Sequence, residues 1–366
     1  MPGNTIGKLF RLTTFGESHG LAIGGIIDGF PAGIAINSDF TQNELDKRKP
    51  GSTNFGSPRK ESDHLEILSG VFQGVSLGTP IAFMVRNADA KPGDYEALRN
   101  TFRPSHADYT YSIKYGIRDH RGGGRSSARE TVSRVVAGAF AKLFLAGMKI
   151  SINAFTDSIG PIKITNPDKY QNIASSSANQ LRCPDPAISE QILLYLADLK
   201  EQGDSTGGTI FCRITGLPPG LGEPVFEKTE SELAKAMLSI NACIGFEYGS
   251  GFAGAALRGS ENNDQWKLTE AKKHNGITLL ETVTNNSGGI QGGITNGQDI
   301  YFRVAFKPVA SIRQPQMSYT SEGEHILLEG GGRHDICVVP RAVAVVEAMA
   351  AIVIADLLLQ QNAYKS

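Results

Sequence analysis

The 366-residue sequence has only four cysteines, at positions 183, 212, 243 and 337, and no two have the spacing of a metal site or a redox pair. We expect reduced thiols in a cytoplasmic protein. The N-terminus lacks a basic region followed by an apolar run, so no signal peptide is expected. The most apolar stretch, residues 342–359, contains Glu347 and Asp356, which favours a buried helix over a membrane span.

The sequence also lacks an excess of either charge, because 36 Lys and Arg residues are balanced by 37 Asp and Glu residues. Nucleic-acid-binding proteins normally have a basic surplus, and RNA-binding modules have aromatic motifs, so no nucleic-acid partner is expected. Apolar residues make up 40% of the chain and charged residues 20%, which excludes a disordered protein.

Glycine is abundant, with 42 residues in clusters, which indicates tight turns or backbone that approaches a ligand closely. Three glycine patterns occur twice in the same order, although each match alone could arise by chance. The pairs are 24–33 with 207–220, 69–74 with 287–292, and 122–125 with 330–333. We expect a single domain over residues 1–366, built from half-repeats at about 5–150 and 205–360.

Local signals predict several helices and strands. A capping box at 127–130 and a following apolar face predict a long helix. Further helices are expected to start at Thr41 and Thr229, to cover 188–202, and to run from Pro340 to about Leu359. Strands are expected at 23–28, 80–85, 209–214 and 300–306. The polar stretches 91–101 and 174–186 are expected to be excursions or lids.

Residues 122–130, Gly-Gly-Gly-Arg-Ser-Ser-Ala-Arg-Glu, lie at the predicted start of the long helix. Free backbone N–H groups and the helix dipole favour an anion there, and Arg125 and Arg129 add positive charge. No Gly-Lys-Ser/Thr follows, so this is not a Walker loop. The alternative is an ordinary capped helix whose arginines face solvent.

Two histidines lie in compact polar turns. Gly16-Glu-Ser-His-Gly20 has the letters of a nucleophile elbow, but a strand is expected after it where the elbow needs a helix. His19 is instead a candidate general acid, the alternative being a histidine that fixes a turn. In the segment 103–108, Asp108 could orient His106 or hold it protonated, the alternative being a hydrogen-bonded loop histidine.

Other charged residues leave alternatives open. Asp335, after the second glycine run, is either a helix-dipole partner or a catalytic carboxylate. The basic segment 46–50, with Arg59 and Lys60, is either a phosphate-gripping loop or a solvated one. No His, Cys, Asp and Glu set has metal-ligand spacing, so no metal is expected. Together these residues imply an enzyme that acts on a polyanionic small molecule, without naming the reaction.

The motifs at 16–20, 103–108, 122–131, 239–242, 307–308 and 333–335 resemble, in this order, those of the chorismate synthase family. The resemblance covers about residues 5–359. It implies a lyase of the shikimate pathway that eliminates phosphate from 5-enolpyruvylshikimate 3-phosphate, with reduced FMN as cofactor and no net redox change. It also implies an α+β fold, a three-layer sandwich with helices between two antiparallel sheets, and a homotetramer.

The resemblance implies roles for individual residues. His19 would assist the departure of phosphate, His106 would serve the flavin near N1, and Asp335 would work with flavin N5. Arginines suit the substrate's carboxylates and phosphate because their planar fork binds such groups in bidentate fashion. The implied substrate-binding residues are Arg48, Arg103, Arg129 and Arg333. The implied FMN-binding residues are Arg125, Ser126, Ser127, Asn241, Ala242, Gly292, Lys307, Pro308, Val309, Ala310, Ser311 and Arg333.

The sequence departs from the family pattern at two places. Asn54 stands where many members have a second basic-loop arginine, and residues 262–282 look longer than usual. Some members, mainly fungal, reduce flavin with NADPH themselves. No additional reductase domain is visible here, so an external source of reduced flavin is expected. The other hypothesis is a non-catalytic flavin- or phosphate-binding regulator, which would not need to keep His19, His106 and Asp335 together.

Overall fold

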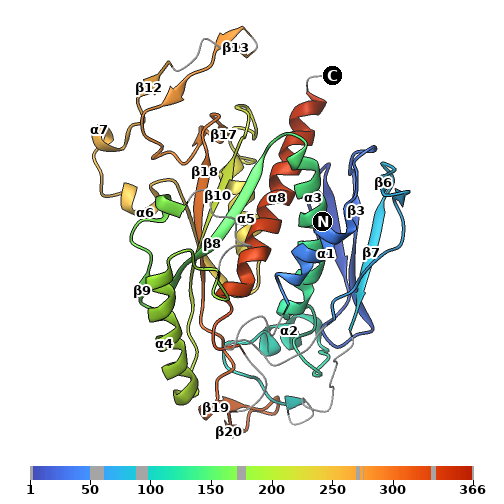
Figure 1. The fold of residues 1–366 in the computed structure, drawn as a ribbon. Coiled ribbons are helices and arrows are strands. Elements are labelled where there is room, and N and C mark those ends of the chain that lie inside the picture. The colour runs from blue at the N-terminus through green and yellow to red at the C-terminus, as the bar shows by residue number, and fades with distance from the viewer. Residues whose placement is uncertain are drawn as a thin grey trace.

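The computed structural model describes residues 3–49, 62–87, 98–170, 179–268, 273–274, 276–330 and 335–364. Within these residues the chain forms three layers, with helices between two five-stranded antiparallel sheets (Figure 1). This is the α+β sandwich that the family resemblance implies. The sheet from the N-terminal part of the chain lies on the right of Figure 1, and the other sheet lies on the left.

The first sheet uses only residues from the start of the chain, in the spatial order β1 (Thr5–Ile6), β2 (Arg11–Phe15), β3 (Ala22–Asp28), β7 (Ile81–Arg86) and β4 (Leu65–Ile67). Alternate side chains of a strand face the helices, so Ile81, Phe83 and Val85 of β7 are buried. A Cβ on Gly24 would lie only 2.3 Å from the carbonyl oxygen of Phe83, so β3 needs glycine there to pack.

The second sheet combines strands from the middle and the end of the chain. The spatial order is β11 (Cys243–Tyr248), β18 (Ile300–Phe306), β10 (Gly208–Thr215), β8 (Ser151–Ile159) and β9 (Ile162–Lys163). Strand β18 alternates regularly between buried and half-buried residues, with Phe302, Val304 and Phe306 turned to the core. This alternation is what a period-2 strand with one face on the core requires.

The middle layer centres on α3 (Thr131–Ala146) and α8 (Val339–Ala363), with α1 (Ser38–Asp46) against α3 and α5 (Thr229–Leu238) against α8. A Cβ on Gly138 would lie 2.3 Å from the Cβ of Ala348, so glycine allows α3 and α8 to cross closely. Helix α8 is long and apolar enough to span a membrane, but nearly all of it is buried between the sheets. It is therefore a core helix, as predicted, and ends four residues beyond the expected Leu359.

Helix α4 (Pro186–Gln202) lies beside β9 at the outer side of the second sheet, and α2 (Asp108–Tyr115) lies below the middle layer (Figure 1). The extended region at 262–282 forms two short two-stranded ladders that project at the top of Figure 1. The remaining short elements are β5 (Val71–Phe72), β6 (Val75–Ser76), η2 (Gly124–Ser126), η3 (Ala128–Glu130), η4 (Pro167–Tyr170), α6 (Gly251–Gly254), α7 (Gly259–Asn262), β12 (Trp266–Lys267), β13 (Lys273–His274), β14 (Ile277–Thr278), β15 (Glu281–Thr282), β16 (Ile290–Gln291), β17 (Ile294–Thr295), β19 (Gln316–Tyr319) and β20 (His325–Leu328).

The predicted strands are confirmed to within one residue at each end. The helix predicted at 188–202 is confirmed as α4, which ends at Gly203 with a φ of 68°. The start predicted at Thr41 is wrong, because Asn37 caps the N–H of Phe40 and α1 begins at Ser38. The capping box is only half formed: Ser127 caps a 3₁₀ turn, and the carboxylate of Glu130 pairs with Arg134. Much of the predicted excursions at 91–101 and 174–186 lies outside the described residues.

Buried charges join the three helices α1, α3 and α8. The Lys142 ammonium of α3 lies 2.6 Å from a carboxylate oxygen of Glu44 and 2.7 Å from one of Glu347. Burial disfavours the charged forms, but the mutual attraction outweighs it, so the pKa of Lys142 is raised and that of Glu44 is lowered. Asp356 of α8 accepts the backbone N–H groups of residues 8–10. Both acidic residues of the apolar C-terminal helix are thus structural.

Candidate active site

The turn that carries His19 connects β2 to β3. Gly16 has a φ of 93°, and the N–H of Gly20 donates to the carbonyl of Glu17, which closes the turn. Ser18 is buried and His19 is half-buried. Strand β3 follows the turn directly, as predicted, so this Gly-x-Ser-x-Gly segment lacks the helix of a nucleophile elbow.

The glycine run before α3 packs against this turn. Gly122 has a φ of 135°, and a Cβ there would lie 2.4 Å from Cδ2 of His19 and 3.1 Å from Oγ of Ser18. Only glycine therefore allows the two segments to approach so closely. Two motifs about a hundred residues apart in the sequence lie side by side, and His19 lies next to the 3₁₀ turns that lead into α3.

Two of the predicted substrate arginines share one buried counter-ion. The carboxylate of Asp63 accepts one hydrogen bond from Arg48, at 3.0 Å, and one from Arg129. All three residues are at most 6% exposed. Burial raises the pKa of Asp63, but the two guanidinium groups outweigh this effect and hold it below its usual range. Burial lowers the pKa of Arg48 to about 10 against the opposing effect of Asp63. Arg48 and Arg129, both held in place by Asp63, form a positively charged group that we call the cationic wall.

The predicted flavin residues around Ser126 are in contact with one another. Asn241 donates its amide to the carbonyl of Ser126 at 2.9 Å, while its amide oxygen is buried with no hydrogen-bond partner. Arg125 donates to Gly16 O and Thr14 Oγ1, and so ties the 3₁₀ turn to the His19 turn. Ala242 has a φ of 64°, a left-handed conformation that is uncommon for a residue with a side chain.

A second group of predicted residues surrounds His106. Nδ1 of His106 lies 3.1 Å from the carbonyl oxygen of Pro104, and Nε2 lies 2.9 Å from Oγ of Ser311. A carbonyl oxygen can only accept, so Nδ1 carries the proton in this contact. The Lys307 ammonium donates to the carbonyl of Ser105, and its backbone N–H donates to the carbonyl of Ala242. These contacts connect the His106 group to the Asn241 group.

Asp108 differs from its expected role beside His106. Its carboxylate binds the guanidinium of Arg103 in bidentate fashion, at 2.7 and 2.8 Å, and that of Arg118 at 2.8 Å. Burial raises the pKa of Asp108, but the two arginines outweigh this effect and hold it below its usual range. Asp108 is therefore the counter-ion that positions Arg103, whereas His106 is hydrogen-bonded to Pro104 and Ser311.

Asp335 lies just before α8 and pairs with Arg341 in the first turn of that helix. Nε of Arg341 also donates to the carbonyl of Arg48 at 3.2 Å, so the predicted catalytic carboxylate is joined to the cationic wall. Arg333, Asn54, Arg59 and Lys60 lie outside the described residues.

Gly292 is separated from the other predicted flavin residues. It lies at the turn between β16 and β17, where the carbonyl of Gly293 accepts the N–H of Thr229 at the start of α5. Asn241 follows the other end of the same helix. Gly292 and Asn241 therefore lie near opposite ends of α5. A ten-residue helix is about 15 Å long.

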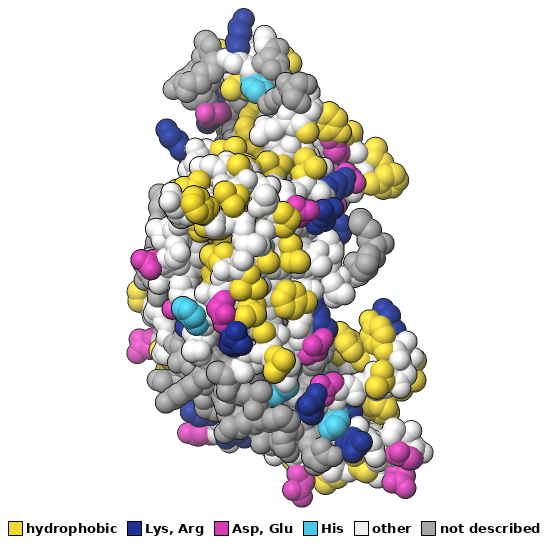
Figure 2. Space-filling view, turned by 90° about the vertical axis from the view of Figure 1, so that its right-hand side faces the viewer, with side chains coloured by type: hydrophobic (Ala, Val, Ile, Leu, Met, Phe, Trp, Pro, Cys, Tyr) yellow, Lys and Arg dark blue, Asp and Glu magenta, His cyan; other side chains and the backbone are white. Residues whose placement is uncertain are grey.

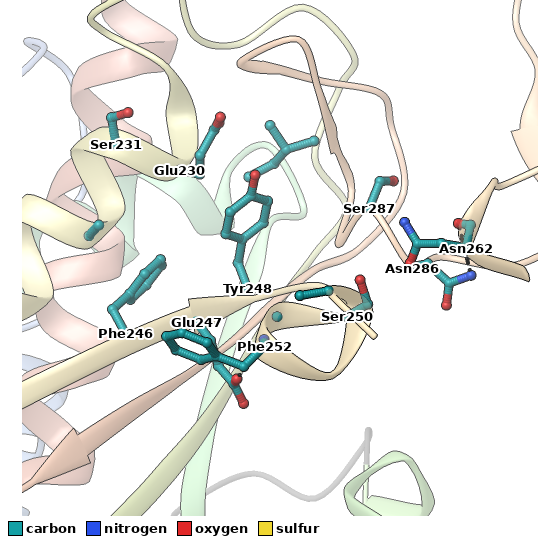
Figure 3. A pocket seen from close by; sticks show the side chains of 14 residues that line it. Glu230, Ser231, Phe246, Glu247, Tyr248, Ser250, Phe252, Asn262, Asn286 and Ser287 are labelled. Carbon is teal, nitrogen blue, oxygen red and sulfur yellow. Dashed lines mark hydrogen bonds between the residues drawn. The ribbon is translucent and has the colours of Figure 1, made fainter. Parts of the chain in front are cut away.

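A pocket of about 570 Å³ lies beside β11, and none of the predicted site residues is among its lining residues (Figure 3). Its walls are Phe246 and Tyr248 of β11, Phe252 of α6, and Glu230 at the start of α5. A half-open pocket with aromatic walls and no Lys or Arg in its lining does not suit a polyanionic substrate. The candidate active site is therefore the cationic, histidine-bearing region at the starts of α3 and α8.

Sequence reasoning missed Asp63, Arg118 and Arg341, which position predicted site residues through long-range ion pairs. Asp63 has one indirect signal, because it lies close in sequence to the basic segment. For Arg118 and Arg341 no local pattern points to their partners. Buried arginines need counter-charges, but only the fold shows which carboxylates supply them.

The fold and these residues define an α+β protein whose candidate site combines buried arginines with two histidines. The sequence profile of the chorismate synthase family matches residues 10–359. The chorismate synthase of Christiangramia forsetii is 53% identical over 365 residues and covers 100% of both chains. That of Cytophaga hutchinsonii is 54% identical over 362 residues and covers 99% of both chains.

A solved crystal structure of a chorismate synthase matches this fold with a TM-score of 0.77 and 33% sequence identity. The match covers 97% of this chain and 93% of the other. The chain therefore belongs to the chorismate synthase family, and it is a lyase of the shikimate pathway.

Proposed function

We propose that this chain eliminates phosphate from 5-enolpyruvylshikimate 3-phosphate and forms chorismate with reduced FMN bound beside the substrate. The observation that carries this proposal is the contact of the His19 turn with Gly122, next to the buried pair Arg48 and Arg129. If His19 acts as a proton donor, this arrangement supports the departure of phosphate, which needs a proton and fixed positive charge.

The substrate has one phosphate and two carboxylates, so it needs several cations at fixed positions. Arg48 and Arg129 are held by Asp63, and Arg103 is held by Asp108. Because each guanidinium is held by a carboxylate, little side-chain freedom is lost when the substrate binds. We propose that these three arginines, with Arg333, bind the phosphate and carboxylates.

We propose that His19 donates a proton to the leaving phosphate. An imidazole exchanges protons near neutral pH, and a protonated phosphate is a better leaving group than a fully ionised one. The packing of Gly122 against the ring and the closed turn at Glu17–Gly20 restrict where the imidazole can lie.

The described residues fit a flavin. The buried amide oxygen of Asn241 needs a donor, which flavin ring N–H groups can supply, and Lys307 and Arg125 lie on adjoining segments with positive charge for a phosphate. Reduced FMN, when bound, supplies electron density that stabilises the substrate ring as phosphate leaves. The residues proposed to hold it are Arg125, Ser126, Ser127, Asn241, Ala242, Lys307, Pro308, Val309, Ala310, Ser311 and Arg333. Gly292, which lies at the other end of α5 from Asn241, stays a prediction from the family resemblance.

His106 and Asp335 are proposed to act at the flavin edge. Ser311 and the Pro104 carbonyl orient the His106 ring, which would serve flavin N1. Asp335, which is held in place by its ion pair with Arg341, is proposed to work with flavin N5. The reduced flavin is proposed to come from an external reductant, and the enzyme is proposed to work in the cytoplasm.

We also propose a homotetramer. Figure 2 shows apolar side chains, in yellow, on the side of the molecule where the first sheet lies. Among the described residues, the helices pack on the opposite, inner face of this sheet. Phe15, Ile26 and Leu68 are each at least 41% exposed on or beside this sheet, and Leu21 is 95% exposed. Apolar patches of this kind are typical of surfaces that are covered by a partner.

The role of His19 is tested by His19→Ala. We expect turnover to fall by about 10²- to 10⁴-fold, the range for loss of a general acid, while FMN and substrate still bind. The matched control is His274→Ala, because His274 lies in the projecting arm at β13. Unchanged turnover in His19→Ala would contradict the assigned role, and loss of both ligands would point to a structural role.

A further inference from the structure

Asn87 lies at the junction of the His19 turn and the cationic wall. It directly follows β7, whose last ladder pair joins Arg86 to Ala22 of β3. The backbone N–H of Asn87 extends this ladder by donating to the carbonyl of Leu21 at 3.1 Å. The sheet register therefore places Asn87 opposite the end of the His19 turn.

The side chain of Asn87 bridges two elements of the site. Its amide nitrogen donates to the carbonyl of Glu17 at 3.0 Å and to that of Gly20 at 2.8 Å. Its amide oxygen accepts from Nε of Arg129 at 2.9 Å. The two carbonyls need a donor and the guanidinium needs an acceptor, so the partners fix the orientation of the amide.

The two carbonyls are those of the residues that bound the turn. Glu17 precedes Ser18 and Gly20 follows His19, and the N–H of Gly20 donates to the carbonyl of Glu17. Asn87 therefore holds both ends of the two-residue segment that carries the imidazole. On its other side, Arg129 is held by Asp63, which also binds Arg48.

We propose that Asn87 is a positioning residue for the reaction, which sets the distance between the His19 imidazole and the arginines that bind the leaving phosphate. It touches neither substrate nor flavin in this role, and acts through the His19 turn and through Arg129. The inference rests on the proposed roles of those two residues. It adds that Asn87 holds His19 and the phosphate-binding arginines at a fixed distance from each other before the substrate binds.

The chemistry of the position restricts what can replace Asn87. An aspartate has no N–H for the two carbonyls, and an aliphatic side chain serves none of the three partners. Asn87 is half-buried, so water can replace its hydrogen bonds and the fold should tolerate its removal. The geometry would loosen, and a small misplacement of a catalytic group costs about 100-fold in rate.

The test measures kcat and KM for Asn87→Leu, which keeps a similar volume, and for Asn87→Ala. We expect kcat to fall about 10- to 100-fold through His19 and KM to rise through Arg129. The control is Asn179→Ala, because Asn179 bridges Leu181 and Ser189 beside α4, and it should keep wild-type values. Thermal unfolding of each variant shows whether the fold is kept, and Asn87→Leu carries the test if the alanine variant does not fold.

A double-mutant cycle with His19→Ala separates positioning from general damage. We expect Asn87→Leu to change kcat less than about 3-fold once His19 is absent, because no acid is left to misplace. An equal loss of kcat in both backgrounds, or wild-type kinetics in the Asn87 variants, would overturn the positioning role alone. Full turnover in His19→Ala by itself would instead overturn the proposed function of His19.

Discussion

Asp63 is fully buried with a φ of 45°, a left-handed conformation that costs a residue with a side chain about 1–2 kcal/mol. Its position is explained by what it binds, because each carboxylate oxygen serves one of two buried arginines. Two like charges buried close together need such a counter-ion. The proposed substrate-binding arginines therefore depend on a residue that need not touch the substrate.

Replacing Asp63 by asparagine keeps the shape and removes the charge. We expect Asp63→Asn to lose about 3–5 kcal/mol of unfolding free energy at pH 7, the cost of leaving buried charges unpaired. The measurement is urea unfolding, with the exposed Asp39→Asn as a control that should change stability by less than about 0.5 kcal/mol. A loss no larger than that of the control would contradict the role of Asp63.

The difference in unfolding free energy between wild type and Asp63→Asn should depend on pH, because it follows the pKa of Asp63. Its folded pKa lies below the ordinary value of 3.8, so its stabilisation is complete above that value. The stabilisation is lost as the pH falls through the folded pKa. The stability gap between wild type and Asp63→Asn should therefore narrow when unfolding is measured below about pH 4.

Single residues of the site could be predicted only where the chemistry is local. The turn at 16–20 and the glycine run at 122–124 have sequence signals, and the structure brings them together. The pairing of Asp108 with Arg103 and Arg118 replaced the expected pairing with His106, because guanidiniums compete better than imidazole for a buried carboxylate. That competition depends on a tertiary contact that spacing does not reveal.

Helices and strands were predicted well where the residues that mark their ends or their buried face are visible in the sequence of the segment itself. Gly203 ends α4, and the alternation of β18 is visible in its letters. The start of α1 was missed because the cap, Asn37, precedes a run with weak periodicity. Helix α8 has no polar face, so the sequence indicated a buried helix without indicating that Glu347 would bind Lys142.

The Lys142 network ties α1, α3 and α8 together, and we expect Lys142→Met to cost about 3–5 kcal/mol of unfolding free energy. The matched control is Lys235→Met on α5, where an exposed i,i+3 pair with Glu232 contributes less than about 1 kcal/mol. Urea unfolding at pH 7 measures both. Equal losses in the two variants would mean that the buried network does not join the helices.

Acid should reduce the difference in unfolding free energy between wild type and Lys142→Met. The folded pKa of Glu44 lies below its ordinary value of 4.5, so its stabilisation is present above that value and is lost as the pH falls through the folded pKa. The gap between wild type and Lys142→Met should therefore shrink between pH 7 and about pH 3. A gap that widens in acid would contradict the assignment of Glu44 as a charged partner.

At the scale of the whole molecule, the two sheets and the middle helices were predictable as a class from the family resemblance. The half-repeats at about 5–150 and 205–360 stay a prediction. Strands β8 and β9 come from between those segments and complete the second sheet. The site lies where segments from both ends of the chain meet, as the contact of Arg341 with Arg48 illustrates.

The proposed homotetramer predicts a molar mass in solution of about four times 39.2 kDa, measured by light scattering after size exclusion. If the apolar outer face of the first sheet is an interface, Ile26→Lys should lower the mass, because burying an unpaired charge is costly. Leu194→Lys, on the exposed face of α4, is the control and should leave the mass unchanged. A wild-type mass of one chain would contradict the tetramer.

The most direct test of the central claim is an anaerobic assay with purified protein, dithionite-reduced FMN and 5-enolpyruvylshikimate 3-phosphate, with oxidised FMN as the control. Chorismate absorbance and phosphate release are followed together. We expect equal amounts of chorismate and phosphate with reduced flavin only. Binding of both ligands without product would contradict the proposed reaction and favour a non-catalytic binding protein on the same fold.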